Sequence, residues 1–291
     1  MKQKTVFGYN INVLLFDSER KCCDDMRKYK LEVSLFSTRG RIRSINQDNY
    51  FINGKTLANS ADENDSFRLT CKEGLFAVAD GMGGEHDGEF ASLAVVRALA
   101  DMKQRTPTYE QLCKCIENAN NLIFARSESI SARIGSTIVA AVISGERLAV
   151  CNVGDSKCLM YKDGKITQLS KDHTVTAQLV EAGIITPEQA LKDNRRHRLF
   201  QHLGIPQEEM TLSVYSNEEV VIQDGDIIIL CSDGLTDGLS FDDISSAIKE
   251  NNDIDNLSQK LAALAMEKGS TDNITVMTIA VTEKKRFFGL F

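Results

Sequence analysis

The stretch Leu75-Phe76-Ala77-Val78-Ala79-Asp80-Gly81-Met82-Gly83-Gly84 decides how the rest of the chain is interpreted. Its first five residues are apolar and contain no turn former, which predicts a short buried strand. The strand ends in one carboxylate, Asp80, followed by three glycines in four positions, and glycine allows unusual dihedrals and close backbone approach. Such a turn can hold a hard cation, with a backbone carbonyl as a further oxygen ligand. A glycine turn with Asp80 as a local turn former is the alternative.

Other acidic strand ends favour the cation site. Asp155, Asp233 and Asp272 each lie at one end of an apolar run, beside a glycine or another small residue, and Asp48 precedes a further predicted strand. Clustered carboxylates repel each other and have raised pKa values unless a cation neutralises them. Because the set contains no His or Cys, its oxygen ligands favour Mg²⁺ or Mn²⁺ over Zn²⁺ or Cu²⁺.

An arginine near these acids points to phosphate chemistry. Two divalent ions about 3.5–4 Å apart can share a water molecule, lower its pKa and direct it at phosphorus. Arg43 lies shortly before Asp48, and its planar guanidinium suits phosphate oxygens. These residues predict a hydrolase built from carboxylates and one arginine. The alternative is a surface Arg43 followed by a polar turn, Asn46-Gln47-Asp48.

Composition excludes several classes of protein. The net charge of -7 over 291 residues argues against a nucleic-acid partner, which requires a basic face. No apolar run reaches the roughly 20 residues of a membrane helix, and Val13-Leu14-Leu15-Phe16 is too short for a signal peptide. No C-x-x-C pair occurs among the eight cysteines, so a zinc site is not expected. Without an export signal we expect reduced thiols in a cytoplasmic protein, and we expect a monomer. The cysteines are Cys22, Cys23, Cys71, Cys113, Cys115, Cys151, Cys158 and Cys231.

Apolar runs joined by tight turns predict antiparallel sheets, and apolar stripes at helical spacing predict helices that pack against them. Strands are predicted at 31–38, 49–52, 75–79, 138–143, 148–153, 157–161, 226–231 and 274–281. Helices are predicted at 91–102, 112–123, 175–182, 241–249 and 257–267. The polar residues 53–73 are expected to form an exposed hairpin loop.

Three segments fall outside this pattern. Residues 1–30 form an extension without a predicted role, residues 172–210 a polar and more helical insert, and residues 283–291 a basic and aromatic tail. The histidines are interpreted as hydrogen-bonding loop residues, with an acid–base pair of Asp172 and His173 as the alternative. They are His86, His173, His197 and His202.

Seven motifs in order give the chain, from about residue 31 to 282, a resemblance to a known family. They resemble those of the PP2C-type (PPM) metal-dependent protein serine/threonine phosphatases, in particular the bacterial branch. The motifs are Arg43 with Asn46-Gln47-Asp48, Val78 to Gly84, Gly135-Ser136-Thr137, Val153-Gly154-Asp155-Ser156, Asp172-His173, Cys231 to Leu235, and Asp272 to Thr275. The resemblance implies an α+β fold, an α-β-β-α four-layer sandwich with two central antiparallel sheets flanked by helices. It also implies a metal cleft at one edge.

The resemblance assigns a role to each acid. It implies that Asp80 bridges two Mn²⁺ or Mg²⁺ ions and that the Gly81 carbonyl binds one of them. Asp233 and Asp272 would complete the other, and Asp48 would act through bound water or from the outer shell.

Further roles follow from the same resemblance. Asp155 corresponds, together with Asp233, to a third and weaker metal site. Arg43 corresponds to the phosphate-binding arginine, and the insert 172–210 to a flap that influences substrate choice.

The chain departs from the family pattern at three positions. Met82 stands where the animal enzymes carry a histidine proposed as general acid, so leaving-group protonation would fall to a metal-bound water. Gln47 replaces a glutamate, and Lys157 replaces the usual arginine. None of these changes removes a predicted direct ligand.

The predicted activity is hydrolysis of phosphoserine and phosphothreonine in proteins, opposing a Ser/Thr kinase. A catalytically silent binding module with the same fold is one alternative, although such a module does not need converging carboxylates. A phosphatase for small phosphoesters is another, because the same metal centre hydrolyses both kinds of substrate.

Overall fold

The computed structural model describes residues 29–56, 64–83, 87–206, 211–217, 219–250 and 253–283. The predicted extension therefore lies outside the described residues except for Tyr29 and Lys30, which already belong to the first strand. The predicted tail also lies outside them, apart from Glu283, and so does His86.

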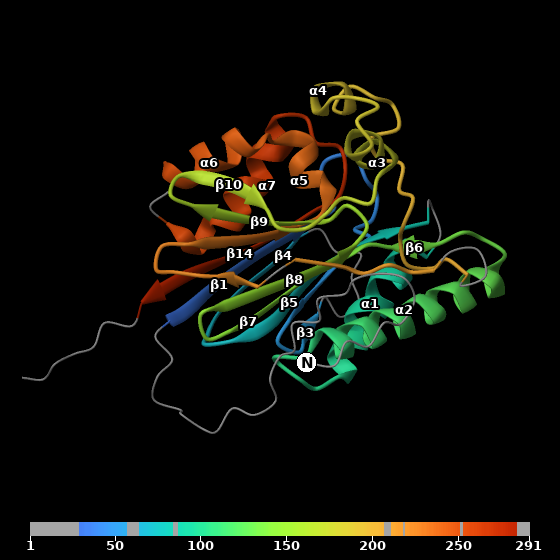
Figure 1. Cartoon of the computed structure of the whole chain (residues 1–291), viewed down its shortest axis with the longest axis horizontal. Helices are drawn as coiled ribbons and strands as arrows, with labels where there is room; N and C mark the ends of the chain where they lie inside the picture. Colours follow the sequence, from blue (N-terminus) through green and yellow to red (C-terminus); the bar gives the residue numbers. More distant parts are fainter. Residues whose placement is uncertain are drawn as a thin grey trace, which may run out of the picture.

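Two antiparallel sheets form the centre of the molecule (Figure 1). In spatial order, the first contains β10 (Lys165–Gln168), β9 (Lys157–Lys162), β13 (Ile227–Cys231), β14 (Ile274–Glu283), β1 (Tyr29–Thr38) and β4 (Asn64–Cys71). The second contains β11 (Tyr215–Ser216), β8 (Arg147–Val153), β7 (Ile138–Ser144), β5 (Gly74–Met82), β2 (Asp48–Ile52) and β3 (Lys55–Thr56). Two short strands extend the second sheet, β12 (Val220–Val221) beside β8 and β6 (Gly135–Ser136) beside β5.

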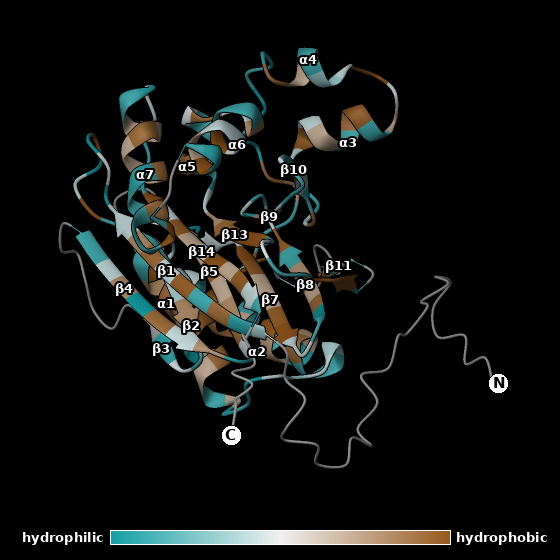
Figure 2. Ribbon diagram, turned by 90° about the vertical axis from the view of Figure 1, so that its left-hand side faces the viewer, coloured by the Kyte–Doolittle hydropathy of each residue, from teal (hydrophilic) through white to brown (hydrophobic). Residues whose placement is uncertain are grey.

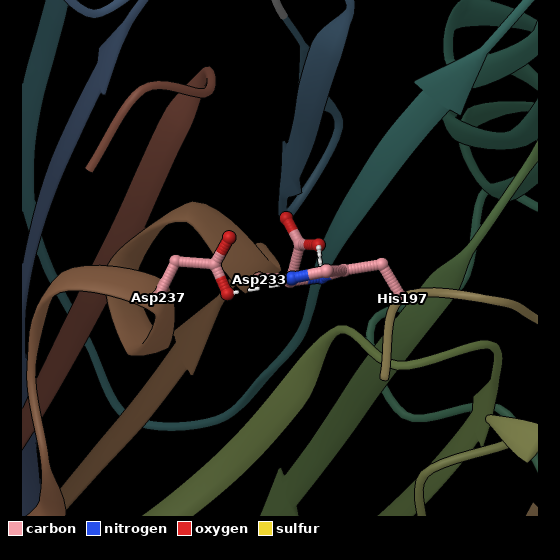
Figure 3. A group of neighbouring side chains, drawn as sticks. All are labelled: His197, Asp233 and Asp237. Atoms are coloured by element: carbon pink, nitrogen blue, oxygen red, sulfur yellow. Dashed lines mark ion pairs between the residues drawn. The ribbon is translucent and has the colours of Figure 1, made fainter. Parts of the chain in front are cut away.

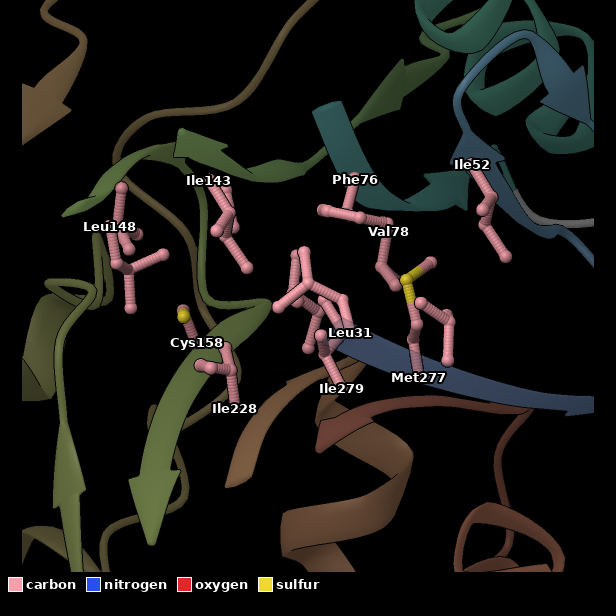
Figure 4. Packing of buried hydrophobic residues seen from close by; sticks show 14 of the residues in the cluster. Leu31, Ile52, Phe76, Val78, Ile143, Leu148, Cys158, Ile228, Met277 and Ile279 are labelled. Carbon is pink, nitrogen blue, oxygen red and sulfur yellow. The ribbon is translucent and has the colours of Figure 1, made fainter. Parts of the chain in front are cut away.

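The apolar run of β5 is continuous because both faces of this strand are buried. Side chains alternate between the faces of a sheet. Phe76 and Val78 point into the core between the two sheets, where they pack with residues such as Leu31 and Ile279 (Figure 4). The odd-numbered residues of the run, Leu75, Ala77 and Ala79, face a separate core beneath the helices.

Helices cover both outer faces, so the predicted four-layer sandwich is confirmed (Figure 1). The second sheet is covered by α1 (Gly88–Asp101) and α2 (Tyr109–Ile130). The first is covered by α5 (Asp233–Gly238), α6 (Phe241–Lys249) and α7 (Leu257–Glu267), the last preceded by a 3-10 turn, Ile254–Asn256. Within the described residues, no helix has both the length and the hydropathy that crossing a membrane requires.

The described part of the predicted insert, residues 172–206, contains two short helices that lie outside the sheets (Figures 1 and 2). These are α3 (Val175–Glu181) and α4 (Pro187–Ala190). Each begins after a threonine whose side chain accepts a hydrogen bond from the third helical backbone N–H, Thr174 for α3 and Thr186 for α4. The insert is joined to the body by an isolated bridge between Ser136 and Leu203.

The predicted exposed loop 53–73 is only partly a loop, because it contains β3 and β4. β4 pairs with β1 over eight residues, and its side chains alternate between exposed and half-buried along an edge of the first sheet (Figure 2). Polar composition concealed it, since an edge strand needs few apolar residues and charged ones protect it from pairing with other chains.

Candidate metal centre

The structure brings the five predicted aspartates into one electrostatic cluster. The antiparallel pairing of β2 with β5 places Asp48 directly opposite Asp80. The carboxylates of Asp48, Asp155, Asp233 and Asp272 all raise the pKa of Asp80. Strand ends from both sheets therefore converge, as the sequence predicts.

Gly81 allows the strand that carries Asp80 to approach the backbone before Asp48. A Cβ atom on Gly81 would lie 2.0 Å from the carbonyl oxygen of Gly88 and 2.6 Å from that of Gln47. The Gly81 N–H instead donates a hydrogen bond of 3.1 Å to the Gln47 carbonyl. Only glycine fits this contact.

Gly234 has the same role in the first sheet. A Cβ atom there would lie 2.1 Å from the carbonyl oxygen of Asn273. The backbone that follows Asp233 therefore packs directly against the backbone that follows Asp272. In both pairs, the glycine after one aspartate sets the approach of the neighbouring chain segment.

Asp48 is a buried carboxylate with incomplete hydrogen bonding. Its side chain is 1% exposed, and its Oδ2 accepts a hydrogen bond of 2.7 Å from the Ser232 hydroxyl. Its Oδ1 is buried without a hydrogen-bond partner in the described part of the chain. Burial raises the pKa of Asp48 to about 7, and the hydrogen bond from Ser232 offsets only part of this effect.

Burial also raises the pKa values of Asp80, in β5, and of Asp155, which lies between β8 and β9. Burial, followed by the charge of Asp48, raises the pKa of Asp80 well above its usual range. Burial also raises the pKa of Asp155 to about 7, although the nearby Lys157 ammonium lowers it. Lys157 donates to the Asp155 carbonyl oxygen at 3.1 Å and to Asp172 Oδ2 at 2.6 Å. One lysine leaves most of the negative charge of the cluster uncompensated.

Asp233 differs from these acids because a histidine faces it. Burial disfavours its charge, but the neighbouring imidazole of His197 lowers the pKa of Asp233 below its usual value. The Nδ1 atom of His197 lies 3.6 Å from Asp233 Oδ2 and 3.8 Å from Asp237 Oδ1 (Figure 3). The nearby carboxylate of Asp233, and after it that of Asp237, raises the pKa of His197 despite burial. The second Asp233 oxygen, Oδ1, is buried without a hydrogen-bond partner among the described residues.

Arg43 lies at the exposed side of the cluster. Its Nη2 donates to Asp272 Oδ2 at 2.7 Å, while 55% of its side chain remains exposed. The hydrogen bond to Asp272 raises the pKa of Arg43. A charged guanidinium is thus held beside the acids, within reach of solvent.

The donor set fits hard divalent cations. It consists of carboxylate oxygens, and the pKa values of Asp48, Asp80 and Asp155 are raised. Asp48 Oδ1 and Asp233 Oδ1 are buried without a hydrogen-bond partner among the described residues. A bound cation would both satisfy these oxygens and cancel the repulsion between the carboxylates.

Two histidines have different roles: His173 is structural, whereas His197 lies at the acid cluster, which the sequence did not predict. His173 is 6% exposed, its Nδ1 accepts from the Gly154 N–H at 3.1 Å, and its ring packs on Phe200. It is therefore a hydrogen-bonding loop residue, as predicted. His197 was assigned to the same class, yet it reaches the acid cluster, as does Asp237. Asp237 follows Asp233 by one helical turn, but α5 itself was not predicted.

Sequence comparisons identify relatives of the chain. The family model described as "Protein phosphatase 2C" matches residues 42–181. Over 250 residues the chain is 30% identical to "Serine/threonine phosphatase stp" of Listeria innocua, covering 83% of this chain and 92% of that one. It is 31% identical over 252 residues to "Serine/threonine protein phosphatase PstP" of Mycobacterium tuberculosis, covering 85% of this chain. The alignment spans 44% of the length of that relative.

A solved structure shares the fold. The catalytic domain of the serine/threonine protein phosphatase PstP, in complex with two manganese ions, superposes with a TM-score of 0.69 at 30% identity. The superposition covers 88% of this chain and 100% of the other.

Proposed function

The chain belongs to the protein phosphatase 2C family, and we propose on this premise that it hydrolyses phosphoserine and phosphothreonine in proteins with the help of Mn²⁺ or Mg²⁺. The observation that carries the proposal is the convergence of five aspartates from both sheets beside one arginine. Such a cluster destabilises the folded chain unless cations bind to it, so a structural role alone does not account for it.

The proposed ligands of two ions are Asp80, the Gly81 carbonyl, Asp233 and Asp272, with Asp48 acting through water. Asp155 and Asp233 are proposed to hold a third, weaker ion. When bound, the ions supply a water molecule of lowered pKa close to the phosphoryl group. The manganese-bound relative supports this choice of metal.

Arg43 is proposed to bind and orient the phosphate. Its guanidinium is exposed and offers paired N–H donors that match phosphate oxygens. The hydrogen bond to Asp272 holds it beside the acids before substrate arrives. Arg43 would also offset the charge that develops on the phosphoryl oxygens.

Other residues of the chain hold the acids in place. Ser232 donates to Asp48 Oδ2 and itself accepts a hydrogen bond of 3.0 Å from the Thr275 N–H. Lys157 joins the Asp155 carbonyl to Asp172, at the start of the insert. Preorganised carboxylates of this kind need little rearrangement when substrate binds.

The partners of the reaction follow from the proposed chemistry. Phosphoserine and phosphothreonine in proteins are products of Ser/Thr kinases, so the enzyme is proposed to oppose such a kinase. A reducing compartment such as the cytoplasm suits the six cysteines of the described residues, which are all free thiols.

The test is Mn²⁺-dependent release of phosphate from a phosphoserine or phosphothreonine peptide. Asp80→Asn or Asp233→Asn should abolish it, whereas Asp242→Asn, an exposed acid on α6, serves as the matched control. Undiminished activity in the first two variants would refute the mechanism. Activity on small phosphoesters without activity on phosphopeptides would instead reassign the substrate class.

A further inference from the structure

A histidine of the insert reaches the carboxylates of α5. His197 Nδ1, Asp233 Oδ2 and Asp237 Oδ1 come from segments far apart in sequence, yet they lie within 4.8 Å of one another (Figure 3). Throughout the described part of the chain, no other set of three or more His, Cys, Asp or Glu side chains brings its ligand atoms this close. The nitrogen donor distinguishes this set from the all-oxygen ligands proposed above.

The arrangement is built into the local structure. Asp233 and Asp237 are four residues apart on α5, so both carboxylates lie on the same face of the helix. The second oxygen of Asp233 is buried without a hydrogen-bond partner among the described residues. The ring of His197 points from the opposite side toward both acids (Figure 3). The site therefore offers one imidazole nitrogen and two carboxylates, and one oxygen of the Asp233 carboxylate has no hydrogen-bond partner among the described residues.

The spacing is close to that of a metal site. With metal–ligand bonds of about 2.0–2.2 Å, neighbouring ligand atoms are separated by about 3.0–3.5 Å. The nitrogen lies 3.6 and 3.8 Å from the two carboxylate oxygens, a few tenths of an ångström beyond that spacing. All three ligand atoms lie within 4.8 Å of one another, so the side chains must draw together around an ion. Arg196 Nε donates to the other ring nitrogen at 2.6 Å, and this exposed arginine must turn away when Nδ1 binds an ion.

The donor set selects a class of ion. Mg²⁺ prefers oxygen ligands and keeps several waters, whereas imidazole suits transition-metal ions and Zn²⁺. We propose that His197 is a nitrogen ligand carried by the insert, which together with Asp233 and Asp237 binds Mn²⁺ or Zn²⁺ in preference to Mg²⁺. This proposal rests on the proposed function in one respect: Asp233 is shared by the proposed catalytic metal centre and the site at His197. An ion bound there also ties the insert to α5.

Calorimetry tests the preference for the ion. Mn²⁺, Zn²⁺ and Mg²⁺ are titrated separately into the full chain and into His197→Asn, with His202→Asn as the matched control within the insert. Loss of one nitrogen ligand should weaken one Mn²⁺ or Zn²⁺ site by on the order of 10-fold or more and leave Mg²⁺ binding within twofold. Equal losses for all three ions, or no loss, would overturn the proposal.

Pulsed electron paramagnetic resonance of the Mn²⁺-loaded chain provides a direct readout. A coordinated imidazole produces ¹⁴N hyperfine coupling, which aspartates cannot produce. The coupling should be present in the wild type and in His202→Asn and absent in His197→Asn. Its absence from the wild type, or its persistence in His197→Asn, would refute ligation by His197.

These outcomes are separable from failure of the proposed function. Suppose that Asp80→Asn abolishes Mg²⁺-dependent phosphate release, whereas His197→Asn changes neither this activity nor Mn²⁺ binding. The proposed phosphatase function would then hold, and only the nitrogen ligand would be refuted. If instead the ¹⁴N coupling is lost in His197→Asn but the wild type has no phosphatase activity, ligation by His197 would be supported and the proposed function refuted. Because 44% of the His197 side chain is exposed, the substitution should not impair folding, which thermal unfolding verifies.

Discussion

Replacing Asp48 by Asn should stabilise the metal-free protein at pH 8 while impairing its activity. Burial raises the pKa of Asp48 from 3.8 to about 7. The folded chain therefore binds this proton more tightly than the unfolded chain. As the pH rises from 4 to 8, the unfolded chain loses the proton first, and the folded state becomes progressively less stable until the pH passes 7.

The magnitude follows from the shift. About three pKa units at 1.36 kcal/mol each correspond to about 4 kcal/mol of destabilisation at pH 8. An amide cannot ionise, and its carbonyl can still accept the hydrogen bond from Ser232. The amide NH₂ would replace the unpaired buried Oδ1, at a cost of about 1 kcal/mol. The net gain expected for Asp48→Asn is about 3 kcal/mol at pH 8, falling below 1 kcal/mol at pH 5.

Urea unfolding followed by circular dichroism, in the presence of a chelator at pH 5 and pH 8, measures this gain. Asp242→Asn, at an exposed position, should change stability little at either pH. Saturating Mn²⁺ at pH 8 should narrow the gap, because cations then compensate the ionised Asp48. The reasoning fails if Asp48→Asn is no more stable than wild type at pH 8, or if it gains equally at both pH values.

Two further substitutions probe the same cluster. Arg43→Ala should lower kcat/KM for a phosphopeptide by about 10–100-fold, which corresponds to the loss of a hydrogen bond to a charged group, and Arg43→Lys should lower it less. Steady-state kinetics measures this effect. An unchanged kcat/KM would exclude Arg43 from phosphate binding. Gly234→Ala places a Cβ atom 2.1 Å from the Asn273 carbonyl oxygen, so it should cost about 1–3 kcal/mol and weaken Mn²⁺ binding. Wild-type values in both thermal unfolding and calorimetry would contradict that packing argument.

The sequence predicts the central strands well because their burial is simple. Leu75 to Ala79 is continuously apolar, and the structure buries alternate residues against the other sheet and against α1 and α2. β4 escaped prediction because an edge strand with one solvated face carries little apolar signal. α5 escaped because its six residues are too few for helical periodicity to be recognised.

The acids were predictable for a related reason. Each lies next to a strand whose apolar run is visible, so a sheet brings it to an edge. His197 has no such signal, because its position depends on the path of the insert, including the capped helices α3 and α4. Its 36-residue separation from Asp233 says nothing about contact. Local pattern predicts what a strand carries, and the course of a long insert has to be observed.

The centre depends on how the two sheets are held together. Asp48 and Asp80 belong to the second sheet, whereas Asp233 and Asp272 lie at the ends of strands of the first. Hydrogen bonds cross between the sheets at this edge, since Ser232, directly after β13, donates to Asp48.

Asn273 reinforces this connection. Its Nδ2 donates to the carbonyls of Arg39 and Ile45, and its Oδ1 accepts from the Gln47 N–H, which fixes the segment between β1 and β2. The carboxylates consequently stay buried and close together, so burial and, after it, their mutual repulsion keep the pKa values of Asp48 and Asp80 raised. A cation that binds there would relieve a repulsion that the intersheet contacts maintain. The metal binding that we propose and a less stable metal-free fold would then have the same physical origin.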